Sequence, residues 1–363
     1  MTANPTGSPL GFEPVFCTIV PPHILDKAAR SEDSAIAAWA RSSLERDSLE
    51  RTRRRMTTVI GARAAAPPYA DAGAQQTAHR AIYDARHQTA LPGHKVRAEG
   101  DEPGQDATVN RAYAGLGATF ELYLEKFSRY SIDGNGLPLT ASVHYDEDYN
   151  NAFWNGEQMV FGDGDGEIFL DFTLPVDVIG HELTHGVTQY TANLAYFDQS
   201  GALNESLSDV FGSLIKQYSL GQTAAEADWL IGAGLLAPRV SGVALRSMKA
   251  PGTAYDDDVL GKDPQPADMA HYVHTGQDNG GVHINSGIPN HAFYILAEAL
   301  GGNAWERAGQ IWFDTLTGGE LESTCDFEAF ARATAKAAKE RFGAAEEYQA
   351  VLKAWEQVGV PTQ

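Results

Sequence analysis

The sequence predicts an α+β fold in which a β-rich half precedes a helical half. From Arg80 to about Phe172, apolar and polar residues alternate, as they do in strands with one buried face. After Pro175, apolar residues recur at spacings of three and four, the pattern of helices with one buried face. Two such halves in a chain of 363 residues form two lobes with a cleft between them.

The β-rich half shows two alternating patterns, one helix and one turn. The clearest strand is predicted by the strict alternation of Leu137, Leu139, Ala141, Val143 and Tyr145. A further strand is predicted by the alternation of Ile168, Leu170 and Phe172. A helix is expected from about Ala107 to Phe127. The run 162–166, Gly-Asp-Gly-Asp-Gly, predicts a tight turn, because a calcium loop there lacks a later acidic ligand.

The helical half continues almost to the C-terminus. Apolar residues spaced by three and four predict one helix from about Leu203 to Tyr218. Further helices are predicted near 286–300, 303–316, 326–341 and 344–358. Between them, the segment 236–285 is rich in loop-forming residues, and loops this long in a compact domain are usually functional.

A small unit precedes the two lobes. A loosely amphipathic helix is expected from Ser31 to about Met56, and it ends in a cluster of arginines. The following residues are rich in Ala, Pro and Gly, which is typical of a linker. We therefore expect an N-terminal unit, a linker, a β-rich lobe and a helical lobe at 1–60, 61–76, 77–192 and 193–363.

The composition and charge of the chain argue against several classes of function. The formal net charge of −21 argues against binding to nucleic acid or to an anionic membrane. No apolar run approaches the roughly 20 residues that span a bilayer. The first 16 residues lack the basic and apolar regions of a secretory signal, so we expect cytoplasmic synthesis and leave signal-independent secretion open. The two cysteines are far apart in sequence, which argues against a disulfide framework.

The residues with the clearest chemistry form the sequence His181-Glu182-Leu183-Thr184-His185. Residues four apart share one face of a helix, so both imidazoles can bind one metal ion. Glu182 then lies beside the metal, where it can act as a base on a water molecule. The alternative is two histidines on a helix face that make ordinary hydrogen bonds.

A third metal ligand is expected on the next helix. A catalytic zinc usually has three protein ligands and one open position. Glu205 lies in an apolar helix and can supply the third ligand, while Asp209, four residues later, can orient a ligand histidine. The alternative is a solvated face, which the flanking Leu203 and Leu207 argue against.

These motifs resemble those of the thermolysin-like zinc metallopeptidases. In that family an HELTH-like motif is followed by an NEXXSD-like motif, which here spans Asn204 to Asp209. The resemblance runs from about Ile82 to the C-terminus. Other matching stretches are 150–156, 162–166, 246–248 and 278–287.

The resemblance implies roles for individual residues. Glu182 matches the general base, and Tyr196 and His283 match the pair that hydrogen-bonds the oxyanion. Asn204, Asp209 and Asp278 are assigned to orient neighbouring ligand or catalytic groups. Groups that bind the peptide backbone or line the apolar pocket are matched by Asn151, Ala152, Arg246, Phe169, Phe172, Val178 and Leu245.

The N-terminal unit resembles that of a particular branch of the family. The motif Pro21-Pro22-His23-Ile24-Leu25 is similar to that of the short-propeptide, protealysin-like enzymes, whose propeptide covers the cleft. An unrelated extension is the alternative. Cys17 lies just before the motif, and its thiol is either a ligand that blocks the zinc or, as we favour, a simple buried cysteine.

One departure from the family pattern concerns calcium. Asp177 and Asp228 match acidic residues of the family's calcium site, but Lys216 stands where the bridging glutamate is expected. An ammonium group cannot bind calcium, so Lys216 is expected to replace the ion by pairing with a carboxylate. Calcium elsewhere on the acidic surface is not excluded by this substitution.

The sequence thus predicts a zinc endopeptidase with one zinc per chain, made as an autoinhibited precursor. The resemblance implies cleavage on the N-terminal side of bulky hydrophobic residues. The expected partners are peptide or protein substrates and the chain's own propeptide. The alternatives are a zinc aminopeptidase, whose substrate motif we do not find, and a catalytically silent zinc-binding protein, against which the retained Glu182 argues.

Overall fold

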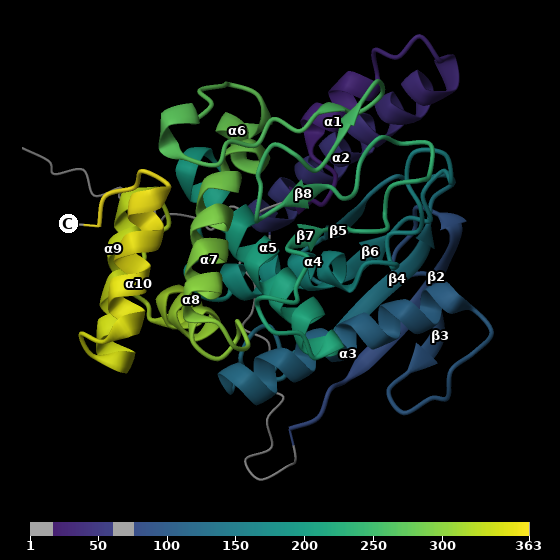
Figure 1. Cartoon of the computed structure of the whole chain (residues 1–363). Coiled ribbons are helices and arrows are strands. Elements are labelled where there is room, and N and C mark those ends of the chain that lie inside the picture. The colour runs from purple at the N-terminus through teal and green to yellow at the C-terminus, as the bar shows by residue number, and fades with distance from the viewer. Residues whose placement is uncertain (1–16, 61–75, 363) are drawn as a thin grey trace, which may run out of the picture.

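A mixed sheet forms the β-rich lobe in the computed structural model, which describes residues 17–60 and 76–362 (Figure 1). The strand order is β1-β5-β6-β4-β2-β3. Its strands are β1 (Cys17–Thr18), β2 (Arg80–Gln88), β3 (His94–Ala98), β4 (Leu139–Tyr145), β5 (Ala152–Trp154) and β6 (Met159–Phe161). The N-terminal strand β1 pairs antiparallel with β5, so the start of the described chain forms one edge of the sheet.

The predicted strand and helix of this lobe are both present. Strand β4 pairs in parallel with β2 and β6, and Leu139, Ala141 and Val143 are buried. Helix α3 (Ala107–Phe127) packs against β2 and β4. It begins at Asp106, whose carboxylate accepts hydrogen bonds from the next backbone amides and so satisfies the helix end.

The strand predicted through Ile168, Leu170 and Phe172 is wrong. This segment makes only an isolated bridge between Phe169 and Leu236. The carboxylate of Asp165 accepts the backbone N–H groups of residues 167–169, at 2.7–3.1 Å, so these amides cannot join a strand ladder. Burial does not alternate here, because Ile168, Phe169 and Phe172 enter the core from a turn while Leu170 is only partly buried.

Helices form the second lobe, and most of them lie on the side of the molecule away from the sheet (Figure 1). They are α5 (Asp198–Leu220), α6 (Asp278–Asn285), α7 (Gly287–Leu300), α8 (Ala308–Thr317), α9 (Phe327–Phe342) and α10 (Glu346–Gln357). Helix α4 (Val176–Gln189) lies between the two lobes, since it packs against both β5 and α5. Short elements lie between α5 and α6: β7 (Leu230–Ile231), β8 (Arg246–Ser247), β9 (Asp256–Asp257), β10 (Gly261–Lys262) and the 3-10 helix η1 (Met269–His271).

Glycines bring α4 and α5 unusually close together. A Cβ atom on Gly180 would lie 2.5 Å from Ile215 Cδ1, and one on Gly212 would lie 2.5 Å from the Asp177 carbonyl oxygen. Because side chains at these two positions would force the helices apart, the glycines allow residues of α5 to reach those of α4. This approach sets the geometry of the candidate site.

The N-terminal segment, residues 17–60, folds back onto the two lobes. It contains helices α1 (Pro22–Ala28) and α2 (Ser34–Ile60), which pack on each other beside β5 and β8 (Figure 1). Ile19, Ile24 and Ile36 are buried in the same hydrophobic core as both lobes. The expected linker, 61–76, lies almost entirely outside the described residues.

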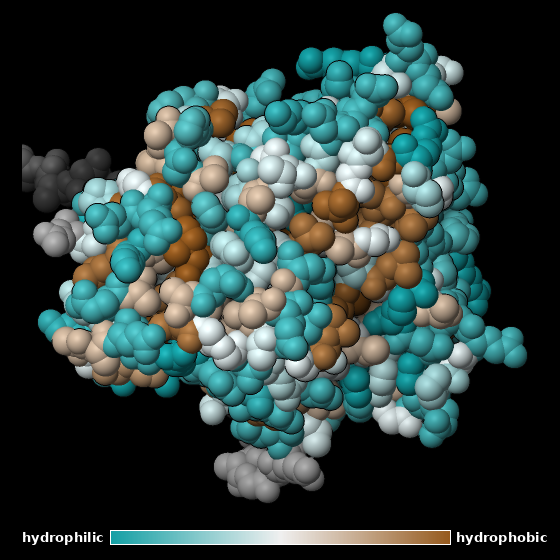
Figure 2. Space-filling view, viewed as in Figure 1, coloured by the Kyte–Doolittle hydropathy of each residue, from teal (hydrophilic) through white to brown (hydrophobic). Residues whose placement is uncertain are grey.

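The face shown in Figure 2 is mostly hydrophilic, with apolar patches between the hydrophilic side chains. Among the described residues, no helix is both long enough and apolar enough to cross a membrane.

Candidate active site

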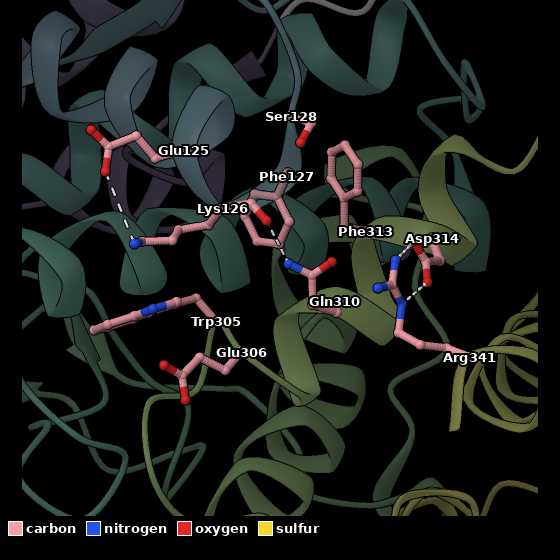
Figure 3. Close-up of a pocket in the computed structure, with 10 residues that line it drawn as sticks. All are labelled: Glu125, Lys126, Phe127, Ser128, Trp305, Glu306, Gln310, Phe313, Asp314 and Arg341. Carbon is pink, nitrogen blue, oxygen red and sulfur yellow. Dashed lines mark hydrogen bonds and ion pairs between the residues drawn. The ribbon is translucent and has the colours of Figure 1, made fainter. Parts of the chain in front are cut away.

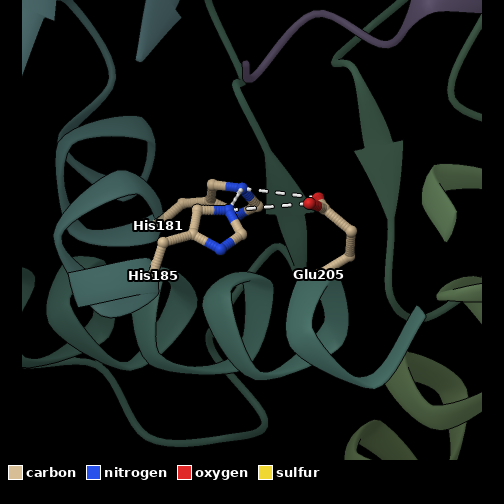
Figure 4. Close-up of side chains that lie close together, drawn as sticks. All are labelled: His181, His185 and Glu205. Atoms are coloured by element: carbon tan, nitrogen blue, oxygen red, sulfur yellow. Dashed lines mark hydrogen bonds and ion pairs between the residues drawn. The ribbon is translucent and has the colours of Figure 1, made fainter. Parts of the chain in front are cut away.

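Two histidines and a glutamate meet where α4 packs against α5. His181 and His185 are one turn apart on α4, and Glu205 faces them from α5 (Figure 4). The two Nε2 atoms are 3.1 Å apart, and each lies 3.5–3.6 Å from a carboxylate oxygen of Glu205. Among the described residues, this is the only group of three potential metal ligands within 4.8 Å of one another.

These distances fit a tetrahedral zinc ion. Zinc–ligand bonds of roughly 2.0–2.1 Å at tetrahedral angles place neighbouring ligand atoms about 3.3 Å apart. The observed separations of 3.1–3.6 Å are close to this value. All three side chains are at most 4% exposed, so the ligand atoms face one another in a site largely screened from solvent.

The other nitrogen of each histidine is held by a neighbouring side chain. His181 Nδ1 lies 2.8 Å from Asp209 Oδ1, and His185 Nδ1 lies 2.8 Å from Asn204 Oδ1. Each Nδ1 therefore donates a proton, which leaves both Nε2 atoms free to bind a metal. Burial lowers the pKa of His185 to about 3, so this imidazole is neutral, as a metal ligand must be.

Glu182 lies beside the three ligands on α4 and is fully buried. Its Oε2 accepts a hydrogen bond of 3.0 Å from the backbone N–H of Trp154 in β5. The carboxylate therefore sits between the metal-ligand cluster and β5, the strand that would form the edge of the sheet without β1. This is the position expected of a base that serves a peptide lying along that strand.

Tyr196 and His283 converge on the same cluster from other elements. The Tyr196 hydroxyl hydrogen-bonds Glu205 and lies 3.2 Å from His283 Nε2. Asp278 accepts from His283 Nδ1 at 2.6 Å and from the His283 backbone N–H at 2.9 Å. Burial would lower the pKa of His283, but the charges of Asp278 and Glu205 outweigh it and raise that pKa, which favours an imidazolium donor.

A turn of left-handed residues places Asp278 against His283. Residues 278–281 all have positive φ angles, from 50° to 87°. A Cβ atom on Gly280 or Gly281 would lie 3.0–3.1 Å from neighbouring atoms, so glycine suits both the conformation and the space. The two glycines in the matching stretch 278–287 therefore serve the backbone conformation that orients Asp278.

The predicted backbone-binding groups are already engaged by the N-terminal segment. The Ile19 N–H donates to the Ala152 carbonyl at 3.1 Å, and the Val20 N–H donates to Asn151 Oδ1 at 3.0 Å. Arg246 Nη1 donates to the Ile19 carbonyl at 3.2 Å. These bonds extend the pairing of β1 with β5, so the segment lies along the edge strand as an added strand.

The predicted apolar pocket residues are all buried, between 0% and 1% exposed, and belong to one core: Phe169, Phe172, Val178 and Leu245. The rings of Phe169 and Phe172 lie 5.7 Å apart. Trp39 of α2 meets Phe169 edge to face at 6.2 Å. The N-terminal segment therefore also reaches the pocket side of the site.

Sequence reasoning missed two further contacts of this segment. Asp47 of α2 is only 2% exposed, and it accepts hydrogen bonds from Tyr149 at 3.1 Å and from Asn151 at 3.4 Å. His23 Nε2 lies 3.0 Å from the Tyr255 hydroxyl. Asp47 occurs in a strongly charged stretch, where nothing distinguishes a buried carboxylate from its solvated neighbours. The thiol of Cys17 lies outside the part of the chain whose side chains are described.

Lys216 lies between the two aspartates that the family pattern assigns to calcium. Its Nζ is 3.0 Å from Asp177 Oδ2, 2.8 Å from Asp228 Oδ1 and 3.0 Å from the Leu230 carbonyl oxygen. The expected ion pairing with Asp177 and Asp228 is therefore present. Whether calcium is excluded stays a prediction.

A hollow of about 550 Å³ opens elsewhere on the surface, between α3, α8 and α9 (Figure 3). Its polar groups bond to one another: Arg341 pairs with Asp314 at 2.5 and 2.7 Å, and Gln310 donates to the Lys126 carbonyl at 2.6 Å. None of the predicted site residues lines it. It therefore adds nothing to the site at α4 and α5.

The two-lobed fold and the cluster between α4 and α5 define a metallopeptidase. The family profile described as "Thermolysin metallopeptidase, catalytic domain" matches residues 69–189, and that described as "Thermolysin metallopeptidase, alpha-helical domain" matches residues 192–360. The chain belongs to the thermolysin metallopeptidase family, whose members depend on zinc.

Individual relatives agree with this assignment. The chain is 52% identical to an extracellular metalloprotease of Pectobacterium carotovorum subsp. carotovorum, over 95% of this chain and 96% of that protein. It is 40% identical to a thermolysin of Alicyclobacillus acidocaldarius subsp. acidocaldarius, over 77% of this chain and 50% of that sequence. The solved precursor of protealysin from Serratia proteamaculans matches with a TM-score of 0.84 and 51% identity, over 95% of this chain and all of that one.

Proposed function

We propose that this chain is the inhibited precursor of a zinc endopeptidase that cleaves peptide bonds on the N-terminal side of bulky hydrophobic residues. The observation that carries the proposal is the convergence of His181, His185 and Glu205 within 4.8 Å, with Glu182 beside them. A purely structural zinc site has no use for a buried carboxylate base next to its ligands. This favours catalysis over the silent zinc-binding alternative.

The residues around the ligands can divide the work of peptide hydrolysis. Zinc bound there would polarise the peptide carbonyl and lower the pKa of water, which is the chemistry that the metal supplies. Glu182 takes a proton from the attacking water and returns it to the leaving amine. Tyr196 and His283 donate hydrogen bonds to the oxygen that becomes negative in the transition state. Asp278 keeps His283 charged and correctly oriented.

Specificity is assigned to the apolar pocket. Its four residues, Phe169, Phe172, Val178 and Leu245, carry no charge and are fully buried. A polar or charged side chain entering such a pocket would lose its hydration without gaining a partner. Substrates with Leu, Phe, Ile or Val after the cleaved bond are therefore preferred. The aminopeptidase alternative is less favoured, because we do not find in the sequence the substrate motif that anchors a free amino terminus.

Inhibition is assigned to the N-terminal segment. Residues 19 and 20 occupy Asn151, Ala152 and Arg246, the groups proposed to bind the substrate backbone. Trp39 reaches Phe169, and Asp47 holds Asn151 from its other side. A peptide cannot pair with the edge strand while the segment lies there. The likeness to a solved precursor over 95% of this chain also supports the proposal.

The enzyme's site of action is proposed from its relatives. The chain shares 52% identity with a protein named an extracellular metalloprotease. We therefore propose that the processed enzyme acts on peptides or proteins outside the cell. The proposed partners are these substrates and the chain's own N-terminal segment.

The inhibitory role can be tested by cutting the chain. A specific cleavage sequence placed within residues 61–75 allows the same preparation to be assayed intact and cut, at equal zinc content. Hydrolysis of a quenched peptide should be much faster after cutting. Trp39→Ala and Asp47→Ala should raise the activity of the intact chain, whereas Glu45→Ala, an exposed position on the same helix, should not. Equal rates for intact and cut chain would reject the inhibitory role.

A further inference from the structure

Asp209 accepts hydrogen bonds from three different elements. His181 Nδ1 lies 2.8 Å from Oδ1, and Arg246 donates through Nε and Nη2 at 2.8 Å each. Asn290 Nδ2 of α7 donates to Oδ2 at 2.9 Å. The carboxylate is fully buried, and Arg246 and His181 together hold its pKa far below the usual range despite that burial.

Asn290 is held rigidly at the start of α7. Its backbone N–H donates to the Ser286 carbonyl at 3.1 Å, and its side chain is fully buried. Gly287, at the first position of α7, could not carry a Cβ atom, which would lie 2.6 Å from the Pro266 carbonyl oxygen. The first turn of α7 is therefore packed tightly against its surroundings and cannot easily move away from Asp209.

The amide orientation of Asn290 follows from electrostatics. With Nδ2 toward Asp209, the amide donates to a carboxylate, whereas the flipped amide would place Oδ1 against a carboxylate oxygen and repel it. In this orientation Oδ1 is buried and has no hydrogen-bond partner among the described residues. An unmade hydrogen bond of a buried oxygen is costly, so an apolar residue would suit this place better unless the N–H group is needed.

We propose that Asn290 is a positioning residue for the zinc site, acting through Asp209 on His181. Arg246 cannot serve this purpose alone, because its guanidinium also donates to the peptide carbonyl of Ile19. A substrate whose carbonyl accepts a hydrogen bond from Arg246 would displace the guanidinium and, with it, the Asp209 carboxylate. Asn290 touches no peptide of the N-terminal segment through any described hydrogen bond, so it holds Oδ2 whether or not the cleft is filled. This inference rests on the proposed zinc site.

Zinc affinity of the intact chain provides the test. Removing a partner that orients a metal ligand typically weakens metal binding by about 10–100-fold, and loss of one of four bonds to Asp209 should fall near the lower end. Asn290→Leu keeps the number and branching of the side-chain heavy atoms and removes the donor. Asn290→Ala serves as the second variant if Asn290→Leu does not fold. Thr334→Val is the matched control, since Thr334 is also fully buried and hydrogen-bonded, but lies in α9.

Two readouts separate positioning from general stability. Competition with a chelator should show about 10-fold weaker zinc binding for the Asn290 variants and wild-type binding for Thr334→Val. The visible spectrum of the cobalt(II)-substituted chain should change only in the Asn290 variants. Unchanged zinc affinity and spectrum in a folded Asn290 variant would overturn the inference. If instead the wild-type chain binds no zinc at His181, His185 and Glu205, the proposed function itself fails.

Discussion

Replacing Lys216 by alanine should lower the stability of the folded chain. Lys216 pairs with Asp177 and Asp228 at the position where the family pattern places calcium. Lys216 is 12% exposed, Asp177 is 1% exposed and Asp228 is 44% exposed. The pair with Asp177 is therefore buried, while the pair with Asp228 is largely screened by water. Asp177 also accepts the Gly232 N–H at 3.1 Å, so the carboxylate cannot turn away when the ammonium is lost.

Most of the expected loss of stability comes from the buried pair of Lys216 with Asp177. Breaking a buried ion pair by removing one partner costs about 3–5 kcal/mol, and an exposed pair adds at most about 1 kcal/mol. For a chain of 363 residues, 3–5 kcal/mol corresponds to a Tm lower by roughly 4–7 °C. Burial already raises the pKa of Asp177 against the pull of Lys216, and Lys216→Ala should raise it further.

Because the pKa of Asp177 is raised, the stability lost in Lys216→Ala should depend on pH. A carboxyl group with a raised pKa in the folded state destabilises that state once the pH exceeds its unfolded value, because it must be ionised while buried. The Tm difference between Lys216→Ala and wild type should therefore be larger at pH 8 than at pH 5. Calorimetry of both proteins, with and without added calcium, is the assay. Lys336→Ala, which breaks a fully exposed pair with Glu320, is the control and should leave the Tm unchanged.

Two results would refute this reasoning. An unchanged Tm in Lys216→Ala would mean that the buried pair contributes nothing. Calcium that raises the Tm of the wild-type chain, and loses that effect when Asp177 is replaced, would mean that the ion binds beside Lys216 after all.

Two further predictions concern specificity and pH. A peptide library should show cleavage before Leu, Phe, Ile or Val, with each methylene removed from that side chain costing roughly 1–3 kcal/mol in discrimination; dominance of charged residues there would contradict the pocket assignment. Burial lowers the pKa of His23 in the docked segment from 6.5 to about 4, so docking is strongest above pH 6.5 and weakens as the pH falls toward 4. At pH 5 the intact chain should hold its segment about 30-fold less tightly, because pH 5 lies 1.5 units below the free pKa of 6.5 while the docked imidazole stays mostly neutral. Activity relative to the cut chain should then rise; His23→Phe should abolish that rise, and a rise that persists in the variant would refute the role of His23.

The metal cluster could be predicted because helix geometry alone brings its parts together. His181 and His185 share a face of α4 through their spacing of four residues, and Glu205 and Asp209 share a face of α5 in the same way. Only the approach of the two helices depends on tertiary structure. The sequence holds a sign of that approach in Gly180 and Gly212, whose role became clear only from the packing.

Other features could not be predicted because they depend on long-range contacts. The pairing of β1 with β5 joins residues more than 130 positions apart, and a two-residue strand leaves no periodic pattern. The bond from Asn290 to Asp209 likewise joins two helices with no shared motif. The strand expected near Ile168 failed for a local reason, since Asp165 captures the amides that a strand would need.

Zinc titration of the cut chain tests the central claim most directly. Metal-free wild-type protein should gain peptide hydrolysis in proportion to added zinc and reach its maximum at one zinc per chain. Glu182→Gln should bind the same single zinc and hydrolyse nothing, because the base is gone while the ligands remain. Glu205→Ala should lose zinc and activity together. Full hydrolysis by purified, zinc-loaded Glu182→Gln, or by wild-type protein without zinc, would contradict the account.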